Sequence, residues 1–322
     1  MRTYSRRPVL RGLWPWAMGM IALMVGACER SRQTPPPDTA AGAAVEPAVD
    51  SGPPPAATGW DAELGPLLFV AGAAPGEAVA VFPEFTDSTL TDTTTFDPAA
   101  VAPTEVEMFT RAGSVGRARL ALAGGPRRVP ADCTAWPTAS VERSGGRGGW
   151  QVAFPVGQAV AIPLDSIEDN TPADSALLAA AVTRLAAALP GDTAPMFRGL
   201  PFFVRSARRF TAAPGTDAVI AQLVRKVNQE ANPREEHLMV IGERPAGGAG
   251  NAPYASAYVE RVSGLEESIE ASDVLAAVQL GAGRRTTLVI GRDYGDGMVY
   301  ALLERRADGR WRLRWSSAYA GC

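Results

Sequence analysis

Short apolar runs separated by glycine and proline turns make up most of the sequence after about residue 60, and they limit the folds open to the chain. Each run suits one β-strand and is too short for a helix, and glycine or proline lies beside most of them. Residues 66–72 and 78–82 are apolar runs, residues 105–111 and 117–122 are expected strands on either side of the turn at 113–116, and residues 150–154 form a further expected strand. We therefore expect a mainly β (α+β) fold built of antiparallel sheets, arranged as a barrel or a sandwich.

One segment departs from this pattern and predicts an amphipathic helix near residues 172–189. Thr171 is a suitable N-cap, Pro172 fits the first helical position, and Asp174 places negative charge in the first turn. Apolar side chains then recur at helical spacing, at Leu178, Val182, Leu185 and Leu189. A proline-glycine pair ends the pattern, and the weakly charged opposite face favours packing on a sheet over binding to a membrane surface.

The C-terminal part of the sequence predicts a three-stranded meander. Strands at 286–293 and 298–306 are joined by a turn at 295–297, and Asp308 and Gly309 supply the turn to a third strand. In that third strand, the apolar residues Trp311, Leu313 and Trp315 alternate with Arg310, Arg312 and Arg314. We expect the three apolar residues to lie on one buried face and the arginines on the opposite, exposed face.

Two stretches of the C-terminal half resemble each other. Residues 238–242 resemble 287–291, and each is followed by a matching segment, 258–261 in the first copy and 302–305 in the second. The first copy carries an extra glycine-rich loop at 246–253. This spacing suits a hairpin-based repeat such as a propeller blade, and chance similarity between two β-rich segments explains it equally well.

The N-terminus has the composition of an export signal. An apolar run at residues 13–27 follows four basic residues and ends in small side chains, and it is too short to span a bilayer comfortably. The basic residues are Arg2, Arg6, Arg7 and Arg11. We expect residues 1–27 to be removed as a signal peptide.

The residues around the expected cleavage site are Val25, Gly26, Ala27 and Cys28. They resemble the lipobox of bacterial lipoproteins, in which a diacylglycerol is attached to the cysteine and the chain is cut just before it. The resemblance implies that Cys28 becomes the first residue, carries lipid such as palmitate, and anchors the protein to a membrane of the cell envelope. Glu29 stands where an aspartate would resemble an inner-membrane retention signal, which favours the outer membrane if the cell is Gram-negative.

Composition divides the rest of the chain into segments. Residues 28–59 are rich in proline and alanine and have few large apolar side chains, which predicts a disordered tether. We expect an N-terminal β region at 60–165, the helix and a connector at 166–200, and a C-terminal β region at 201–322.

Cys133 and Cys322 are the remaining cysteines. An exported protein matures in an oxidising compartment, where an even pair of thiols tends to form a disulfide. We expect Cys133 and Cys322 to be joined, which would constrain the unfolded chain by about 4–5 kcal/mol if the effect is one of loop entropy. Two isolated thiols are the alternative.

The scarcity of histidine and lysine narrows the chemistry open to the chain. His237 is the only histidine and Lys226 the only lysine, so histidine-rich metal sites are excluded and a Ser-His-Asp triad would have to use His237. We expect no catalytic residues and no cofactor. Residues 1–27 carry four arginines and no acidic residue, so the formal net charge changes from −3 for the chain to −7 for the mature protein, which argues against nucleic-acid binding.

A calcium site is a weak metal candidate. Residues 286–315 resemble the strand-loop-strand repeats of the FG-GAP and VCBS class, whose loops hold calcium through aspartates, and Asp293, Asp296 and Gly297 match that pattern. The resemblance implies calcium at Asp293 and Asp296. Calcium takes six or more oxygens and this loop offers two carboxylates, so a plain hairpin turn is the alternative.

These features predict a membrane-anchored protein of the cell envelope that acts as a non-catalytic binding or structural module, with an envelope protein or a glycan as partner. Two alternatives remain, a carboxylate-dependent envelope hydrolase and a calcium-dependent, propeller-like adhesion module. Carboxylates cluster at Asp165, Glu168 and Asp169, at Glu235 and Glu236, and at Glu266, Glu267 and Glu270. A hydrolase predicts two carboxylates converging in a cleft with a raised pKa, whereas a binding module predicts an exposed apolar or aromatic patch.

Overall fold

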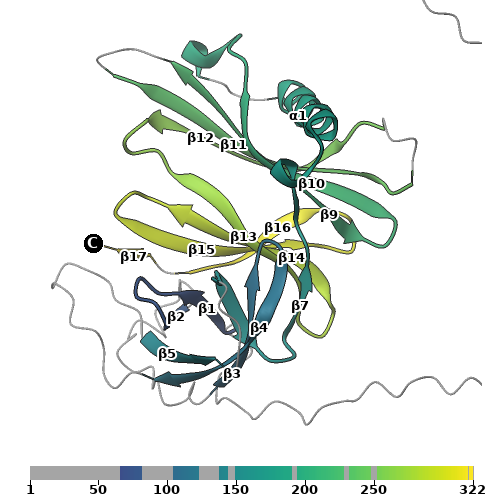
Figure 1. Cartoon of the computed structure of the whole chain (residues 1–322). Helices are drawn as coiled ribbons and strands as arrows, with labels where there is room; N and C mark the ends of the chain where they lie inside the picture. The colour runs from purple at the N-terminus through teal and green to yellow at the C-terminus, as the bar shows by residue number, and fades with distance from the viewer. Residues whose placement is uncertain are drawn as a thin grey trace, which may run out of the picture. The chain divides into compact units, whose positions relative to one another are not determined.

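The computed structural model describes residues 66–81, 104–122, 138–143, 149–190, 194–227, 232–247, 252–317 and 319–321. These residues belong to one compact unit of the chain, Pro53–Cys322, and the other unit, Met1–Gly52, lies outside them. The described chain is mainly β, with antiparallel sheets and a single α-helix (Figure 1). The expected fold class is therefore confirmed.

The N-terminal strands form a closed antiparallel barrel (Figure 1). In order around the ring they are β1 (Leu68–Ala71), β2 (Glu77–Val81), β5 (Thr138–Arg143), β4 (Gly113–Leu122), β3 (Thr104–Thr110) and β6 (Val152–Pro155). Alternate side chains fill the interior, which is built around Phe69, Met108, Leu120 and Trp150. The strands predicted from the short apolar runs are therefore present in this barrel.

Two open antiparallel sheets follow the barrel. The first sheet has the order β12-β11-β10-β9-β8, and the second has the order β16-β15-β14-β13-β7, with β17 also paired to β15. The strands of the first sheet are β8 (Asp165–Ser166), β9 (Phe203–Ala213), β10 (Thr216–Val227), β11 (Arg234–Pro245) and β12 (Ala255–Leu265). Those of the second sheet are β7 (Ala159–Ile162), β13 (Ala271–Leu280), β14 (Arg285–Asp293), β15 (Gly297–Arg305), β16 (Trp311–Ser316) and β17 (Ala320–Gly321).

The two sheets pack face to face and enclose one apolar core. Met239 and Ile241 of β11 enter this core from the first sheet, and Leu288 and Ile290 of β14 enter it from the second. The other face of the second sheet packs on the barrel, where Val289 of β14 joins barrel side chains in a further core. Because the middle of β14 is buried on both faces, residues 288–291 are continuously apolar and lack the alternation of a half-buried strand.

Helix α1 (Pro172–Ala187) covers the outer face of the first sheet and confirms the predicted helix (Figure 1). Thr171 is its N-cap, and its hydroxyl oxygen accepts a hydrogen bond from the backbone N–H of Asp174 at 3.2 Å. The helix ends at the C-cap residue Ala188. The predicted apolar positions that it buries on the sheet are Leu178, Val182 and Leu185.

The predicted meander is present as β14, β15 and β16, but the predicted single apolar face of β16 is wrong. Leu303 of β15 lies opposite Leu313, and Leu302 lies opposite Trp315, so β16 has one extra residue at this point. Trp311 therefore packs between the two sheets and Trp315 packs against the barrel, while Leu313 is 47% exposed. A β-bulge reverses the faces of the residues that follow it, and alternation in the sequence cannot reveal one.

The two similar stretches lie mainly on β11 and β14, in the two facing sheets, and both first segments contribute to the core between them. Val240 and Val289 are equivalent positions in the two copies, but their partners on the next strand are not equivalent. Val240 lies opposite Val259 and Val289 lies opposite Leu302, so the second segments are offset by one residue. Within the described residues, the two copies thus belong to sheets that share a core, as in a sandwich. Propeller blades would instead be arranged around a central channel.

The segment between the barrel and α1 supplies one strand to each sheet. β7 pairs with β13, and β8 pairs with β9, so two strands of the expected N-terminal region belong to sheets built mainly from residues after 201. Two short 3-10 helices, Ile167–Asp169 and Pro195–Phe197, flank α1. Within this segment the chain therefore leaves the second sheet after β7 and enters the first sheet at β8. No change in composition accompanies this step, so the sequence does not show which residues belong to which sheet.

Several sequence predictions fall outside the described residues. They are the signal peptide at 1–27, the tether at 28–59, acylation of Cys28, and the disulfide between Cys133 and Cys322. These stay predictions. Among the helices that the structure does describe, none is long and apolar enough to cross a membrane.

Candidate functional site

At one end of the two packed sheets, the apolar core between them gives way to polar side chains. Alternate residues of a strand share a face, so Gln222 of β10 follows Ile220 on the core side, and His237 of β11 precedes Met239 there. Glu260 of β12 lies opposite Met239 on the same side. The change from apolar to polar residues opens a groove between the sheets.

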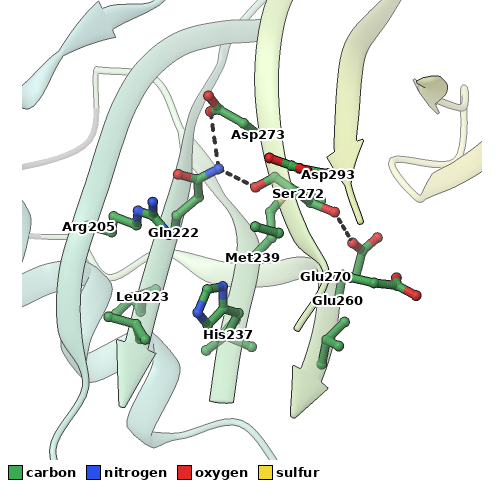
Figure 2. Close-up of a pocket in the computed structure, with 14 residues that line it drawn as sticks. Arg205, Gln222, Leu223, His237, Met239, Glu260, Glu270, Ser272, Asp273 and Asp293 are labelled. Carbon is green, nitrogen blue, oxygen red and sulfur yellow. Dashed lines mark hydrogen bonds between the residues drawn. The ribbon is translucent and has the colours of Figure 1, made fainter. Parts of the chain in front are cut away.

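The groove has an inner cavity of about 200 Å³ and a wider opening of about 440 Å³. The two spaces share the wall residues Arg205, Val224, His237 and Ala271. Figure 2 shows the inner cavity, with Gln222 and His237 supplied by the first sheet and Ser272 and Asp273 by the second. The groove is therefore built from both sheets, and neither forms it alone.

Glu260 joins the two sheets at the floor of the groove. Its carboxylate pairs with Arg292 of β14 at 2.7 Å, and it accepts hydrogen bonds from the hydroxyls of Ser272 and Tyr258, the latter at 3.1 Å. Burial, and then the negative charge of Glu260, raises the pKa of Tyr258 to about 12, so this hydroxyl stays protonated at neutral pH. The carboxylate is thus engaged on several sides in one connected network.

Asp273 connects the groove wall to the barrel. The side-chain amide of Gln222 donates to Oδ1 of Asp273 at 3.1 Å and to the carbonyl oxygen of Ser272. Asp273 also pairs with Arg111, which lies in the turn between β3 and β4 and whose Nε donates to the carbonyl oxygen of Val274 at 2.6 Å. One carboxylate therefore ties together the first sheet, the second sheet and the barrel.

A chain of charged residues lines the opening. Glu235 lies opposite Lys226 across β10 and β11 and pairs with it, and Oε2 of Glu235 lies 2.5 Å from Nε2 of His237. Lys226 also pairs with Glu266 at 3.2 Å. Burial by itself would raise the pKa of Glu235, but hydrogen bonds from His237 and Lys226 outweigh burial and lower it. Glu235 is therefore ionised at neutral pH, and its charge is already compensated.

Arg205 differs from the other charged residues of the groove. On β9, Ser206 lies opposite Gln222 and Val204 lies opposite Leu223, so Arg205 is the extra residue of a β-bulge. A bulge can re-aim a side chain, and Arg205 lines both the inner cavity and the opening. Its guanidinium is exposed and makes no ion pair or hydrogen bond with another residue that the structure describes.

The structure brings part of the clustered carboxylates to the groove. Glu235, Glu266 and Glu270 line it, whereas the cluster at 165–169 lies on β8 and the short helix that follows. A general acid in a hydrolase works with a pKa raised toward the working pH. The lowered pKa of Glu235 is the opposite of that requirement.

Sequence reasoning missed Arg205, Gln222, Glu260 and Ser272. They lie on four strands, and no spacing in the sequence links them. One signal was available, because Gln222 interrupts an otherwise apolar run at 218–224. A polar side chain inside a buried strand requires a hydrogen-bond partner. For Gln222 the partners are Ser272 and Asp273 of the second sheet.

Both calcium candidates lie at the turn between β14 and β15. Oδ1 of Asp293 accepts a hydrogen bond from the backbone N–H of Gly295 at 2.8 Å, and Oδ1 of Asp296 accepts one from the hydroxyl of Tyr319 at 2.6 Å. In the part of the chain that the structure describes, no three His, Cys, Asp or Glu side chains are grouped to hold a metal ion. This geometry fits the plain hairpin turn.

The exposed large apolar side chains are spread over the described chain. Each comes from a different strand, helix or turn: Val160, Leu177, Met196, Phe203, Val259, Leu313 and Tyr319. Single apolar residues of this kind are ordinary on a protein surface. None of them lines the groove, and we take the polar groove as the candidate site.

The groove combines a connected, charge-compensated floor with an arginine at its rim that has no partner among the described residues. Polar groups that are already held in place can bind a polar ligand at little ordering cost. The arrangement therefore suits recognition. No protein-family model, no curated protein and no solved structure matches this chain.

Proposed function

We propose that the protein is a lipid-anchored protein of the cell envelope whose folded part binds, without chemical change, a small ligand with an acidic group in the groove. The observation that carries the proposal is Arg205. Lys226 and His237, the other basic residues that line the groove, are paired, whereas the guanidinium of Arg205 has no partner among the described residues. Such a group is available to a carboxylate or phosphate, which it can bind with two hydrogen bonds.

The floor of the groove supports selective binding. Gln222, Glu260 and Ser272 are held by one another and by charged neighbours, so their polar atoms are positioned before a ligand arrives. The inner cavity of about 200 Å³ admits a small polar group, and the opening of about 440 Å³ leaves room for more of the ligand. We infer that the acidic group lies beside Arg205 and that a hydrogen-bonding group enters the cavity.

The same contacts favour binding over hydrolysis. Ser272 donates its hydroxyl hydrogen bond to Glu260, and His237 is paired with Glu235, so these two residues do not form a nucleophile and base. Glu235 is ionised at neutral pH and cannot serve as a general acid there. The groove therefore lacks the proton-transfer arrangement that a carboxylate-dependent hydrolase needs at these positions.

The lipid anchor is supported by the basic leader, the short apolar run and the lipobox-like residues that end at Cys28. We expect Cys28→Ser to abolish incorporation of radiolabelled palmitate and, in about 1 M salt, which screens purely electrostatic contacts with the membrane, to shift the protein out of the membrane fraction. Cys133→Ser is the matched control and should keep both properties. Unchanged labelling of the Cys28→Ser protein would refute the anchor.

The ligand site is tested by calorimetric titration of the mature protein with soluble peptidoglycan fragments, which carry carboxylates beside sugar and peptide groups. We expect Arg205→Gln to weaken binding roughly 10- to 100-fold, because a hydrogen bond to a charged group contributes about 1.5–3 kcal/mol. Arg198→Gln, at an exposed position outside the groove, is the matched control and should bind as the unchanged protein does.

Two outcomes would contradict the proposal. Equal affinities for the unchanged protein and the Arg205→Gln variant would place the ligand elsewhere. Smaller fragments, detected by mass spectrometry after incubation with the protein, would show hydrolysis and refute a non-catalytic role.

A further inference from the structure

Six exposed arginines lie on the strands and in the hairpin turns of the second sheet, and none of them lines the groove. They are Arg284, Arg285, Arg306, Arg310, Arg312 and Arg314. We call them the arginine surface. Four of these side chains, Arg285, Arg306, Arg312 and Arg314, line one depression of about 560 Å³.

The antiparallel pairing of the second sheet brings these arginines together. Arg312 of β16 lies opposite Glu304 of β15, and the β13–β14 hairpin presents Arg285 to the same glutamate. Glu304 is buried and pairs with Arg285 at 2.9 Å and with Arg314. Burial would raise the pKa of Glu304, but hydrogen bonds from Arg285 and Arg314 outweigh burial and lower it. This ionised glutamate holds two half-exposed guanidinium groups toward solvent.

The arginine surface is strongly positive on an acidic protein. Arg285 and Arg314 pair with Glu304. The backbone N–H of Arg310 donates a hydrogen bond to Asp308, and this bond and the nearby charges of Arg310, Arg306 and Arg312 lower the pKa of the Asp308 carboxyl group. The mature chain, by contrast, has a formal net charge of −7 once the leader and its four arginines are removed from a chain of −3. A local cluster of positive charge on a protein of negative net charge attracts an anionic partner to that part of the surface.

Arg284 occupies a strained backbone position in this surface. Its φ is 46°, and it is the only non-glycine residue with a positive φ in the described chain. L-residues are disfavoured there because the side chain crowds the backbone, and glycine is not. Arg284 therefore adopts this conformation at a cost in backbone stability that a glycine, such as its neighbours Gly281 and Gly283, would not have.

Protection of a sheet edge explains only part of the arrangement. β16 is the edge strand of the second sheet, and charged side chains on an edge discourage pairing with another chain. That role accounts for Arg312 and Arg314. It does not account for Arg284, Arg285 and Arg306, which lie at the start of β14 and after β15.

We propose that the arginine surface docks on a lipid bilayer through its anionic phosphate headgroups. Guanidinium groups bind phosphate oxygens with paired hydrogen bonds. Leu313 is 47% exposed and lines the same depression, where it can enter the interfacial region of the bilayer. If residues 28–59 form the expected tether, it would reach up to roughly 100 Å at about 3.1 Å per residue, which would allow this surface to contact the membrane that holds the lipid anchor.

The test uses the mature chain from residue 28 with Cys28→Ser, which keeps every described element and removes the proposed acylation site. The protein is sedimented with vesicles of phosphatidylcholine alone and with vesicles in which phosphatidylglycerol replaces part of it. We expect sedimentation with the anionic vesicles only. About 1 M salt should release the protein, because it shortens the screening length to about 3 Å.

Substitutions then locate the contact. Replacing Arg284, Arg306 and Arg312 together by serine leaves the pairs of Glu304 intact, and it should lower the vesicle partition coefficient on the order of a hundredfold, from about 1 kcal/mol per arginine. The matched control replaces Arg117, Arg119 and Arg198, three exposed arginines elsewhere, and should bind as the unchanged protein does.

Equal sedimentation with neutral and anionic vesicles would overturn the proposal, and so would an equal loss of binding in both triple variants. Release of the protein by inorganic phosphate at low concentration would also overturn it, because the surface would then be a site for a free anion. Arg205→Gln should bind the anionic vesicles normally. Ligand binding in the groove and docking of the arginine surface on a membrane are therefore tested independently, and failure of one proposal does not contradict the other.

Discussion

The groove and the arginine surface are both rich in charge, but they hold it in opposite ways. In the groove, most charged side chains are paired across different strands, as Glu260 is with Arg292. In the arginine surface, only Arg285 and Arg314 take part in the ion pairs described. Paired charges give a site its shape before binding, whereas unpaired charges remain available to a partner.

We expect the paired charges of the groove to contribute mainly to stability and the exposed arginines of the arginine surface mainly to binding. Removal of one member of a buried pair leaves a charge without compensation, which is costly. An exposed charge contributes little to stability, about 0–1 kcal/mol even when it is paired. Substitutions in the groove floor should therefore destabilise the protein, whereas substitutions of arginines in the arginine surface, apart from Arg284 with its strained backbone, should leave its stability nearly unchanged.

The largest effect is expected for Glu260→Gln. The side chains of Glu260 and Arg292 are 17% and 18% exposed, so the variant leaves a mostly buried guanidinium without its countercharge. We expect the free energy of unfolding to fall by about 2–3 kcal/mol, somewhat less than for a fully buried pair. Urea unfolding measures it, with Arg306→Gln as the exposed control, which should change stability by less than about 0.5 kcal/mol. Similar losses of stability in both variants would show that the charges of the two regions contribute equally to folding.

An intermediate effect is expected from pH, because each region holds one glutamate with a lowered pKa. Burial raises the pKa of Glu235 and of Glu304, and hydrogen bonds from basic neighbours lower each by more than burial raises it. A folded pKa below the unfolded one adds stability that is fully present above the ordinary value of 4.5 and is lost as the pH falls through the lowered value.

Single variants separate these two contributions. The urea midpoint of the unchanged protein should fall on acidification below about pH 4.5, and the midpoints of Glu235→Gln and Glu304→Gln should each fall less steeply. A variant whose midpoint falls as steeply as that of the unchanged protein would show that its glutamate is not paired in solution.

The smallest effect is expected for Arg284→Gly, and here stability and binding should move in opposite directions. Glycine relieves the positive φ of 46°, which should raise the free energy of unfolding by about 0.5–1 kcal/mol. Loss of one guanidinium should weaken binding to anionic vesicles about fivefold. Thermal unfolding and vesicle sedimentation measure the two changes, and Arg306→Ser should reproduce the second without the first. A destabilised Arg284→Gly protein would contradict the strain at this position.

Local structure could be predicted because it depends on residues that are close in the sequence. Thr171 and the helical spacing that begins at Leu178 define α1, and turn residues such as Asp308 and Gly309 delimit the last hairpin. The bulges at Arg205 and near Trp315 could not be predicted in the same way. A bulge is set by the register of the neighbouring strand, which alternation within one strand does not encode.

The candidate site was partly visible in the sequence. His237 and the neighbouring carboxylate Glu235 were considered because of their residue types, and the structure brings both to the opening of the groove. Arg205, Gln222 and Ser272 were not considered, because ordinary polar residues on separate strands carry no local signal. Only the packing of the two sheets places them around one cavity.

The β-rich class, the helix near residues 172–189, the segments able to form strands and the exclusion of a histidine-rich site could all be predicted from the sequence. Each of these follows from periodicity, turn chemistry or composition, which act over a few residues. The pairing of the strands, the basic residue of the groove that has no partner among the described residues, and the place where exposed arginines meet became known only from the tertiary structure. These outcomes depend on contacts between residues far apart in the chain, and such contacts are selected by burying apolar faces together.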